Sequence, residues 1–328
     1  MVTLKIGSIS YMRIWVCLVR ASFPSISFLV LCIVGTALSG EAHPAVVAGT
    51  TYYADSERGS DQNDGASEDS AFRTLARAVA ALNRSGGDTL VIRGVFRETL
   101  QVTWINWSKD AKPDPSRRTI VRCAINAEGN PEHAVIDGGI PSGAASFPFD
   151  CQGKQPGFGA DADNRYLDRG IVIAQSNAVT IDGITIRGIA GLGVLTWRCN
   201  NIVLRNLNVE WISQSALMLS HGRFDDPMVH DLTVEYCRIN QSNLGRWRDR
   251  ENASPQMRGY DMRSETVSLV RWNGFRVHHN HISNSLMEGI DFKEGSCNGE
   301  IHHNLVEQCR SAGIYANEGR DTRIYRNV

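Results

Sequence analysis

The sequence lacks a second long apolar run and an excess of either charge. After residues 1–42, no stretch approaches the roughly 18 apolar residues of a membrane-spanning helix, which excludes a protein that crosses the membrane several times. The 34 Lys and Arg residues balance 35 Asp and Glu residues, a net charge of −1. Such a balance gives no reason to expect a nucleic-acid partner. No Cys-X-X-Cys pair occurs, so a cysteine zinc site is not expected either.

The N-terminus reads as a targeting segment. Residues 1–22 contain the bases Lys5, Arg13 and Arg20 and no acid, residues 26–38 are mostly apolar, and small residues follow at 39–42. This order is typical of a secretory signal peptide. We therefore predict cleavage after residues 1–42 and a protein that is secreted, periplasmic or on the cell surface, without stable membrane insertion. An uncleaved membrane anchor is the alternative.

Cleavage would leave six cysteines, whose pairing the sequence does not determine: Cys123, Cys151, Cys199, Cys237, Cys297 and Cys309. An exported protein is free to form disulfides, and Cys123–Cys151 and Cys297–Cys309 are plausible pairs. Free thiols that pack as small hydrophobic side chains are the other reading.

A repeat organises the second half of the chain. Six segments of alternating polarity share an apolar anchor, and the anchors are 23, 30, 43, 24 and 23 residues apart: Ile181, Leu204, Val234, Val277, Ile301 and Ile324. The two longer intervals are interpreted as a regular step with an inserted loop. A second short strand is expected between copies, at residues 193–197, 215–219, 289–293 and 313–317.

Short strands at this period bury their apolar faces only by stacking on their neighbours, which predicts a parallel β-solenoid with one coil per repeat. Asn280, Asn304 and Asn327 occupy equivalent corners, where stacked amides can bond from coil to coil. Propellers need about 40 residues per blade and leucine-rich repeats need helical segments, so neither fits.

The segment before the repeats predicts a cap. Phe72, Leu75, Val79 and Leu82 share one face of an expected helix over residues 71–82, which ends before Gly86-Gly87. A helix of this kind covers the open end of a stacked sheet. We expect the cap and first coils at residues 50–118 and the parallel β-helix at 119–328.

Several motifs together resemble one family. The Tyr52-Tyr53 pair, the Gly-, Asp- and Asn-rich loop at 59–65, the short helix, the Gly-Gly-Asp-Thr entry at 86–89 and the Asn-cornered repeats are similar to those of the pectate-lyase-like superfamily. The resemblance implies an all-β fold, a single-stranded right-handed parallel β-helix of about 23 residues per coil with an N-terminal capping helix. That superfamily includes lyases, hydrolases, epimerases and non-catalytic surface proteins. Because the chain stops inside a coil, we expect further coils downstream.

One outer face carries candidate chemistry. In the strand at 289–293, alternation buries Ile290 and Phe292 and turns Asp291 and Lys293 outward together. Glu288 and Glu294 flank this strand. Neighbouring coils are expected to add substrate-binding side chains to the same face: Trp197, Tyr315 and Asn317.

These residue types suit β-elimination from a uronate polymer, which needs a base and a cation that neutralises the substrate carboxylate. Lys293 is the candidate base, and Glu288, Asp291 and Glu294 are candidate Ca²⁺ ligands. The Glu288–Lys293 stretch is similar to the glutamate-to-lysine spacing of β-helix enzymes related to alginate lyase and chondroitinase B. Those enzymes have an arginine on the next coil where this chain has Asn317. A solvated ion pair is the structural alternative.

The insertion at residues 240–263 is rich in arginine. Arg246, Arg248 and Arg258, together with Trp247, would suit a lip that grips an anionic glycan by forked hydrogen bonds. A loop of this length in a compact repeat is otherwise a polar connection.

Five histidines fall within 26 residues, and two pairs occupy equivalent positions on successive coils: His278 with His302 and His279 with His303. Stacked imidazoles could bind a transition metal or transfer protons, although near-duplicate coils also explain the pairs. The insertion at 221–226 adds two acids that would serve as cation ligands.

Taken together, the sequence predicts an exported, monomeric protein that cleaves an anionic, uronate-containing polysaccharide by Ca²⁺-assisted β-elimination, with Lys293, Asp291 and Glu288 as catalytic residues. A glycoside hydrolase that uses Asp291 with Glu288 or Glu294 as its acid/base pair is the second reading. A non-catalytic solenoid that binds glycan or protein is the third.

Overall fold

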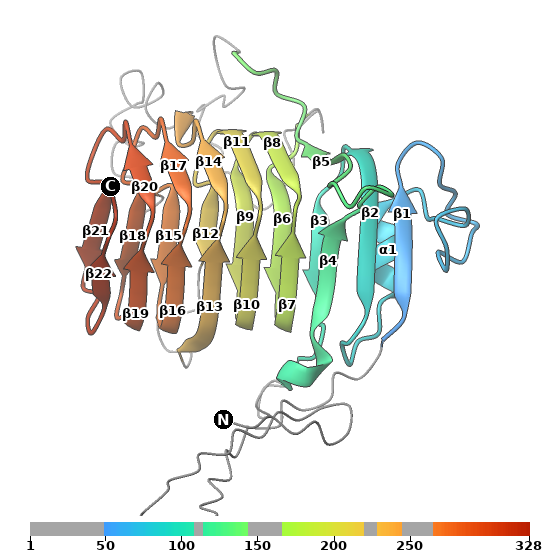
Figure 1. Ribbon diagram of the computed structural model, residues 1–328, viewed down its shortest axis with the longest axis horizontal. Helices are drawn as coiled ribbons and strands as arrows, with labels where there is room; N and C mark the ends of the chain where they lie inside the picture. The colour runs from blue at the N-terminus through green and yellow to red at the C-terminus, as the bar shows by residue number, and fades with distance from the viewer. Residues whose placement is uncertain (1–48, 108–113, 144–165, 220–227, 245–264) are drawn as a thin grey trace, which may run out of the picture. The chain divides into compact units, whose positions relative to one another are not determined.

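Short strands of alternating polarity dominate the fold, and successive strands pair in parallel. The computed structural model describes residues 49–107, 114–143, 166–219, 228–244 and 265–328. Figure 1 shows the strands of successive coils side by side, from β6 and β7 to β21 and β22. Within this part of the chain, no helix is long and apolar enough to span a membrane.

The strands form three ladders. Ladder 1 contains β1 (Thr51–Asp55), β2 (Thr89–Phe96), β4 (Thr119–Cys123), β7 (Asn177–Asp182), β10 (Asn200–Arg205), β13 (Val229–Glu235), β16 (Trp272–His278), β19 (Cys297–His302) and β22 (Arg323–Tyr325). Ladder 2 begins at the end of β2 and contains β5 (Ala134–Asp137), β8 (Thr185–Ile189), β11 (Asn208–Ile212), β14 (Arg238–Asn240), β17 (His281–Ser283) and β20 (Leu305–Glu307). Ladder 3 contains β3 (Leu100–Thr103), β6 (Arg169–Ala174), β9 (Leu192–Trp197), β12 (Leu217–Leu219), β15 (Val267–Val270), β18 (Ile290–Lys293) and β21 (Ile314–Asn317).

The repeat predicted from the sequence corresponds to the strands of ladder 1, and its spacing sets how these strands pair. Its six anchors pair in one unbroken row, from Ile181 with Leu204 to Ile301 with Ile324. The first five anchors are buried in the core between the ladders. The fold is therefore the parallel β-helix expected from the sequence.

Each coil turns at residues with left-handed backbone, which Asn, Asp and Gly accept at the lowest cost. One such corner, with φ of 50–75°, lies near the start of the six ladder 1 strands from β7 to β22: Ala178, Asn201, Asp231, Gly274, Asn298 and Asp321. A second, with φ of 53–71°, follows the strand: Gly183, Asn206, Tyr236, His279, His303 and Arg326. These fixed corners explain why the polarity pattern returns at a constant step.

The predicted asparagine column is confirmed. Asn280 donates from its backbone N–H and its Nδ2 to Oδ1 of Asn304, both at 3.0 Å, and Asn304 repeats the pattern toward Asn327 at 3.0 and 2.9 Å. On the preceding coil, the backbone N–H of Cys237 donates to Oδ1 of Asn280 at 2.9 Å. The column thus joins the turns between ladders 1 and 2 of successive coils.

The five described cysteines form no disulfide with one another, so the proposed Cys297–Cys309 pair is not formed. Cys151 lies outside the described residues, so the Cys123–Cys151 pairing stays a prediction. Burial raises the pKa of Cys199 and of Cys237 to about 12. Both thiols therefore pack as small apolar groups rather than reacting as thiolates.

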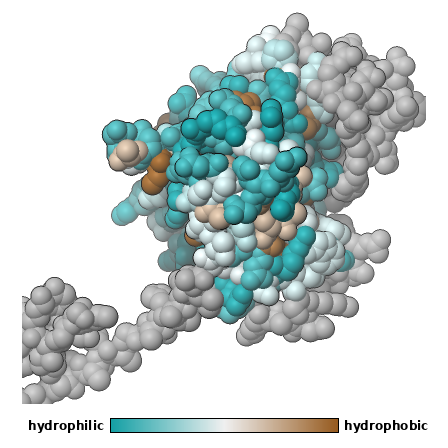
Figure 2. Space-filling model, turned by 90° about the vertical axis from the view of Figure 1, so that its right-hand side faces the viewer, coloured by the Kyte–Doolittle hydropathy of each residue, from teal (hydrophilic) through white to brown (hydrophobic). Residues whose placement is uncertain are grey.

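A short helix, α1 (Leu75–Ala81), lies within the predicted range of 71–82 and packs against β1, β2 and β3. The hydroxyl of Thr74 accepts a hydrogen bond from the N–H of Arg77 at 3.1 Å, and the Glu98 carboxylate accepts from the N–H groups of Leu75 and Ala76 at 2.9 and 3.1 Å. These contacts satisfy donors that a helix N-terminus leaves unpaired. Figure 2 looks onto the side where β1 and α1 lie, and this surface is largely hydrophilic.

Candidate functional site

The candidate site predicted on ladder 3 is a buried cluster of charged side chains. Asp291 and Lys293 both lie on the side of β18 that faces away from the core, as alternation requires, and Oδ2 of Asp291 is 3.1 Å from Nζ of Lys293. Lys293 also forms an ion pair with Glu265, whose Oε2 accepts a hydrogen bond from the Ser268 hydroxyl at 2.9 Å. We call Glu265, Asp291 and Lys293 the acid–lysine triad.

The prediction that Asp291 and Lys293 turn into solvent is wrong. Their exposed fractions are 1% and 2%, and Glu265 is buried as well. Period-two alternation assigns a side chain to one side of a strand, but it does not say whether that side is covered. The shared orientation is therefore as predicted, whereas the exposure is not.

Burial sets the protonation of Asp291. Loss of solvent raises the pKa of this carboxyl to about 6, and the neighbouring Glu265 charge acts in the same direction, while Lys293 opposes the rise. Among the described residues, Lys293 forms ion pairs with both carboxylates of the triad. Oδ1 of Asp291 accepts no hydrogen bond from the described residues. A carboxyl with a pKa near neutrality is a candidate for proton transfer.

Two further acids flank β18 without joining the triad's ion pairs. Glu288 precedes the strand, and its Oε1 accepts a hydrogen bond from the Ser311 hydroxyl at 2.7 Å. Glu294 follows the strand at a left-handed corner with φ of 52°. Its backbone N–H donates to the carbonyl of Asn317 at 3.0 Å.

The donor set does not fit the calcium site predicted at Glu288, Asp291 and Glu294. In the part of the chain that the structure describes, no three His, Cys, Asp or Glu side chains are placed to hold a metal ion. A cation bound by Asp291 would also lie beside the Lys293 ammonium, 3.1 Å from the same carboxylate. We therefore derive no chemical step through calcium.

The predicted substrate-binding aromatics are spread along ladder 3. Tyr315 pairs directly with Asp291 in the next coil and is 47% exposed. Trp197 is 39% exposed but belongs to β9, with β12 and β15 lying between it and β18. Asn317 lies at the end of β21, on the coil of Tyr315. Tyr315 and Asn317 are therefore near the triad, and Trp197 is not.

Sequence reasoning missed strand β15 and, with it, two members of the site. Ser268 and Val270 of this strand pair with Asp291 and Lys293, and Glu265 immediately precedes it. The strand was not predicted because it lies in the longest interval between anchors, which was interpreted as an inserted loop. The alternating segment Val267–Val270, placed one regular step before β18, was the signal that could have identified it.

The arginine-rich lip falls outside the described residues. Arg246, Trp247, Arg248 and Arg258 are therefore not placed, and the acidic insertion at 221–226 is not placed either. Their roles stay predictions.

The paired histidines form two stacks of rings on ladder 1. Ring centroids are 4.9–5.1 Å apart along each stack: Tyr236, His279 and His303 in one, and His278, His302 and Tyr325 in the other. Across the stacks, the Nδ1 atoms of His278 and His279 are 3.0 Å apart. Burial first, and then the surrounding imidazoles and Arg276, lower the pKa of His278 to about 4. Near-duplicate coils thus give two stacks of rings, in which the pKa values of His278 and His302 are lowered.

Comparison with known proteins agrees with this architecture. The family model described as a right handed beta helix region matches residues 169–328. Together with the parallel ladders, this match defines the class: the chain is a right-handed parallel β-helix protein. No curated protein matches the sequence.

Two solved structures illustrate the likeness in fold. That of pectate lyase Pel9A is 12% identical with a TM-score of 0.51, and the match covers 86% of this chain and 63% of the other. A rhamnogalacturonan lyase is 12% identical with a TM-score of 0.47, with coverages of 84% and 62%. The chain thus spans less than two thirds of the length of each.

Proposed function

We propose that this chain acts on a polysaccharide at the outer side of ladder 3, with the Asp291 carboxyl as the group that transfers a proton. The observation that carries the proposal is the acid–lysine triad, in which burial raises the pKa of Asp291 to about 6. Tyr315, exposed on the adjacent strand, offers a ring against which a sugar can pack. The likeness in fold to a pectate lyase supports a glycan as substrate.

The proposed reaction is β-elimination from a uronate-containing glycan. In this reaction, a base removes the proton alpha to the uronate carboxylate, negative charge builds on that carboxylate, and the bond to the leaving sugar oxygen breaks. Asp291 would accept the proton, and the Lys293 ammonium would stabilise the growing charge. Hydrolysis by Asp291 with Glu265 fits less well, because its two carboxyl groups act on separate sides of the bond, whereas these two bind the same ammonium. Hydrolysis by Asp291 with Glu288 or Glu294 is the alternative that the assay below separates from elimination.

This assignment moves the base from Lys293 to Asp291. The Lys293 ammonium forms ion pairs with two carboxylates, and an ammonium has no electron pair with which to accept a proton. The triad is covered in this structure, so the proposal requires Asp291 to become accessible to substrate. Labelling of the Asp291 carboxyl with a carbodiimide and an amine, followed by peptide mass spectrometry, measures that accessibility directly.

Asp291→Asn is the central test. It keeps the shape of the side chain but removes its charge, so we expect the elimination rate to fall by about 10²–10⁴-fold. The assay follows the ultraviolet absorbance of the unsaturated uronate product on a panel of uronate polysaccharides. It is run with Ca²⁺ and with a chelator, which also tests the calcium prediction. In the wild type, the rate should rise with pH through about 6, as Asp291 ionises.

Glu128→Gln, in an exposed turn, is the matched control and should keep the wild-type rate. Full activity of Asp291→Asn would remove the assignment of Asp291. New reducing ends without the ultraviolet signal would show hydrolysis instead. Lys293→Ala separates the two lysine roles: a quaternary ammonium such as tetramethylammonium, which cannot accept a proton, should partly restore the rate if Lys293 only stabilises charge.

Glycan binding without turnover is the second candidate function, and the burial of the triad favours it. A triad that is only structural would leave binding intact while no product forms on any polymer. Binding measured beside turnover on the same panel distinguishes the two.

A further inference from the structure

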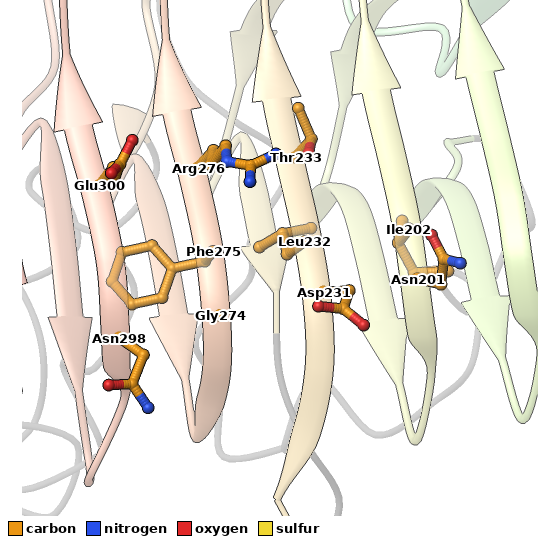
Figure 3. A pocket seen from close by; sticks show the side chains of 10 residues that line it. All are labelled: Asn201, Ile202, Asp231, Leu232, Thr233, Gly274, Phe275, Arg276, Asn298 and Glu300. Carbon is orange, nitrogen blue, oxygen red and sulfur yellow. The ribbon is translucent and has the colours of Figure 1, made fainter. Parts of the chain in front are cut away.

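The outer side of ladder 1 has a hollow that the site on ladder 3 does not use. Its volume is about 360 Å³, and it extends across β10, β13, β16 and β19. This volume lies within the range of about 300–1,000 Å³ that is usual for ligand sites. Figure 3 shows Asp231 and Asn298 on either side of Gly274, with Arg276 and Glu300 in the row above.

The hollow exists because one corner lacks a side chain. Asn201, Asp231, Gly274 and Asn298 occupy the same left-handed corner on successive coils. Only Gly274 has no side chain there, which leaves open the space between Asp231 and Asn298. A Cβ atom on Gly274 would lie 3.4 Å from Oδ1 of Asp231, at the edge of this space.

Two charged groups at the hollow are available to a ligand. The side chains of Asp231 and Arg276 are exposed, and neither forms a hydrogen bond or ion pair with another described side chain. Arg276 interacts with Glu300 through its charge alone. Asn298 donates through Nδ2 to Oδ1 of Asn273 at 2.7 Å, which leaves its own Oδ1 as an acceptor. Glu300 is already neutralised by an ion pair with Arg323.

We propose that this hollow is a second glycan-binding site, which holds a short run of sugar units across the strands of ladder 1. A sugar presents neighbouring hydroxyl groups that both donate and accept hydrogen bonds. The Asp231 carboxylate and the Asn298 amide oxygen accept from them, and the guanidinium of Arg276 donates in a forked geometry. Polar groups line most of the hollow, which suits a hydroxylated ligand better than an apolar one.

The test measures binding, not turnover. The probes are trigalacturonate, which is acidic, and cellotriose, which is neutral, and the background is Asp291→Asn, so that a bound glycan is not cleaved. Gly274→Asn fills the hollow with a residue that tolerates a left-handed corner. Arg276→Ala removes the forked donor. Each change should raise the dissociation constant of the bound probe by about tenfold. A loss of affinity of this size is expected when one hydrogen bond to a charged group is removed.

Arg238→Ala, an exposed arginine on ladder 2, is the matched control and should bind as the parent does. Thermal unfolding shows that each variant is folded, and the two changes at the hollow are independent, so failure of one still leaves a test. Tighter binding of trigalacturonate than of cellotriose would identify an acidic glycan, and the reverse a neutral one.

Binding of neither probe, or equal binding by Gly274→Asn, Arg276→Ala and the control, would overturn the second site. The proposal does not depend on the triad. If Asp291→Asn kept full lyase activity, the assignment on ladder 3 would fail while the binding result at Gly274 and Arg276 would stand.

Discussion

At the scale of single residues, the triad shows how burial changes the role of a carboxyl. Asp291 is almost fully covered, and one lysine neutralises both it and Glu265. Burial is the largest cause of the raised pKa of Asp291, and the adjacent charge of Glu265 adds to it. This burial, rather than exposure to solvent, makes Asp291 the candidate proton carrier.

The pKa of Asp291 predicts a pH dependence of stability. Its value of about 6 in the folded chain is above the usual value of 3.8, so the folded state binds the proton more tightly than the unfolded state. The stabilisation is complete below pH 4 and is lost as the pH rises through 6, by about 2–3 kcal/mol. Urea unfolding at pH 4, 5, 6 and 7 should therefore show wild type losing stability relative to Asp291→Asn.

The stability of wild type must be compared with that of Asp291→Asn at each pH, because His278 changes the stability with pH in the opposite direction. Its pKa is lowered to about 4, so its contribution is lost as the pH falls from about 6.5 toward 4. Parallel curves for wild type and Asp291→Asn would show that the pKa of Asp291 is not raised.

At the scale of elements, the turns between ladders 1 and 2 are held by asparagine amides rather than by apolar contacts. Oδ1 of Asn304 accepts two hydrogen bonds from Asn280, and Nδ2 of Asn304 donates to the carbonyl of Val277 at 2.9 Å. Each amide thus satisfies backbone groups of the neighbouring coil that are buried from water.

Asn304→Ala tests this element. It leaves the N–H of Asn280 and the carbonyl of Val277 without their partners, so we expect a loss of about 2–4 kcal/mol in the free energy of unfolding. The midpoint of guanidinium unfolding measures it. Asn130→Ala, at an exposed turn, is the control and should change stability little. Equal effects of the two substitutions would contradict the role of the column.

At the scale of the whole molecule, each coil is stabilised mainly by the coils on either side, as in other solenoids. Ile301 lies in the inward row of ladder 1, pairs with Val277 and Ile324 on either side, and is fully buried. Ile125, just after β4, is 52% exposed. The same residue type thus has different surroundings at these two positions.

These two isoleucines form a matched pair of substitutions. Ile301→Ala should destabilise the chain by about 2–5 kcal/mol, because it leaves a cavity between coils. Ile125→Ala should cost about 1 kcal/mol or less, since its side chain is half in water already. Unfolding monitored by circular dichroism gives both values. Similar losses would show that stability is not set by nearest-neighbour coils.

The sequence by itself determined the coil. The anchors from Ile181 to Ile324, the asparagine column and the helix near Leu75 were all found from spacing alone. Each depends on a pattern that recurs at a fixed step and on contacts with the next copy, so local sequence carries the information. The long insertion concealed strand β15, and strands β3 to β6, which precede the first anchor, were not predicted individually.

Only the tertiary structure decided the environment of the candidate site. Glu265 precedes β15 and Lys293 ends β18, and their contact depends on how the coil after the long insertion stacks on the next one. Burial of Asp291 and the hollow beside Gly274 likewise arise from neighbours on other coils. Periodicity tells which side of a strand a residue faces, whereas the surrounding coils decide whether that side is covered, charged or open.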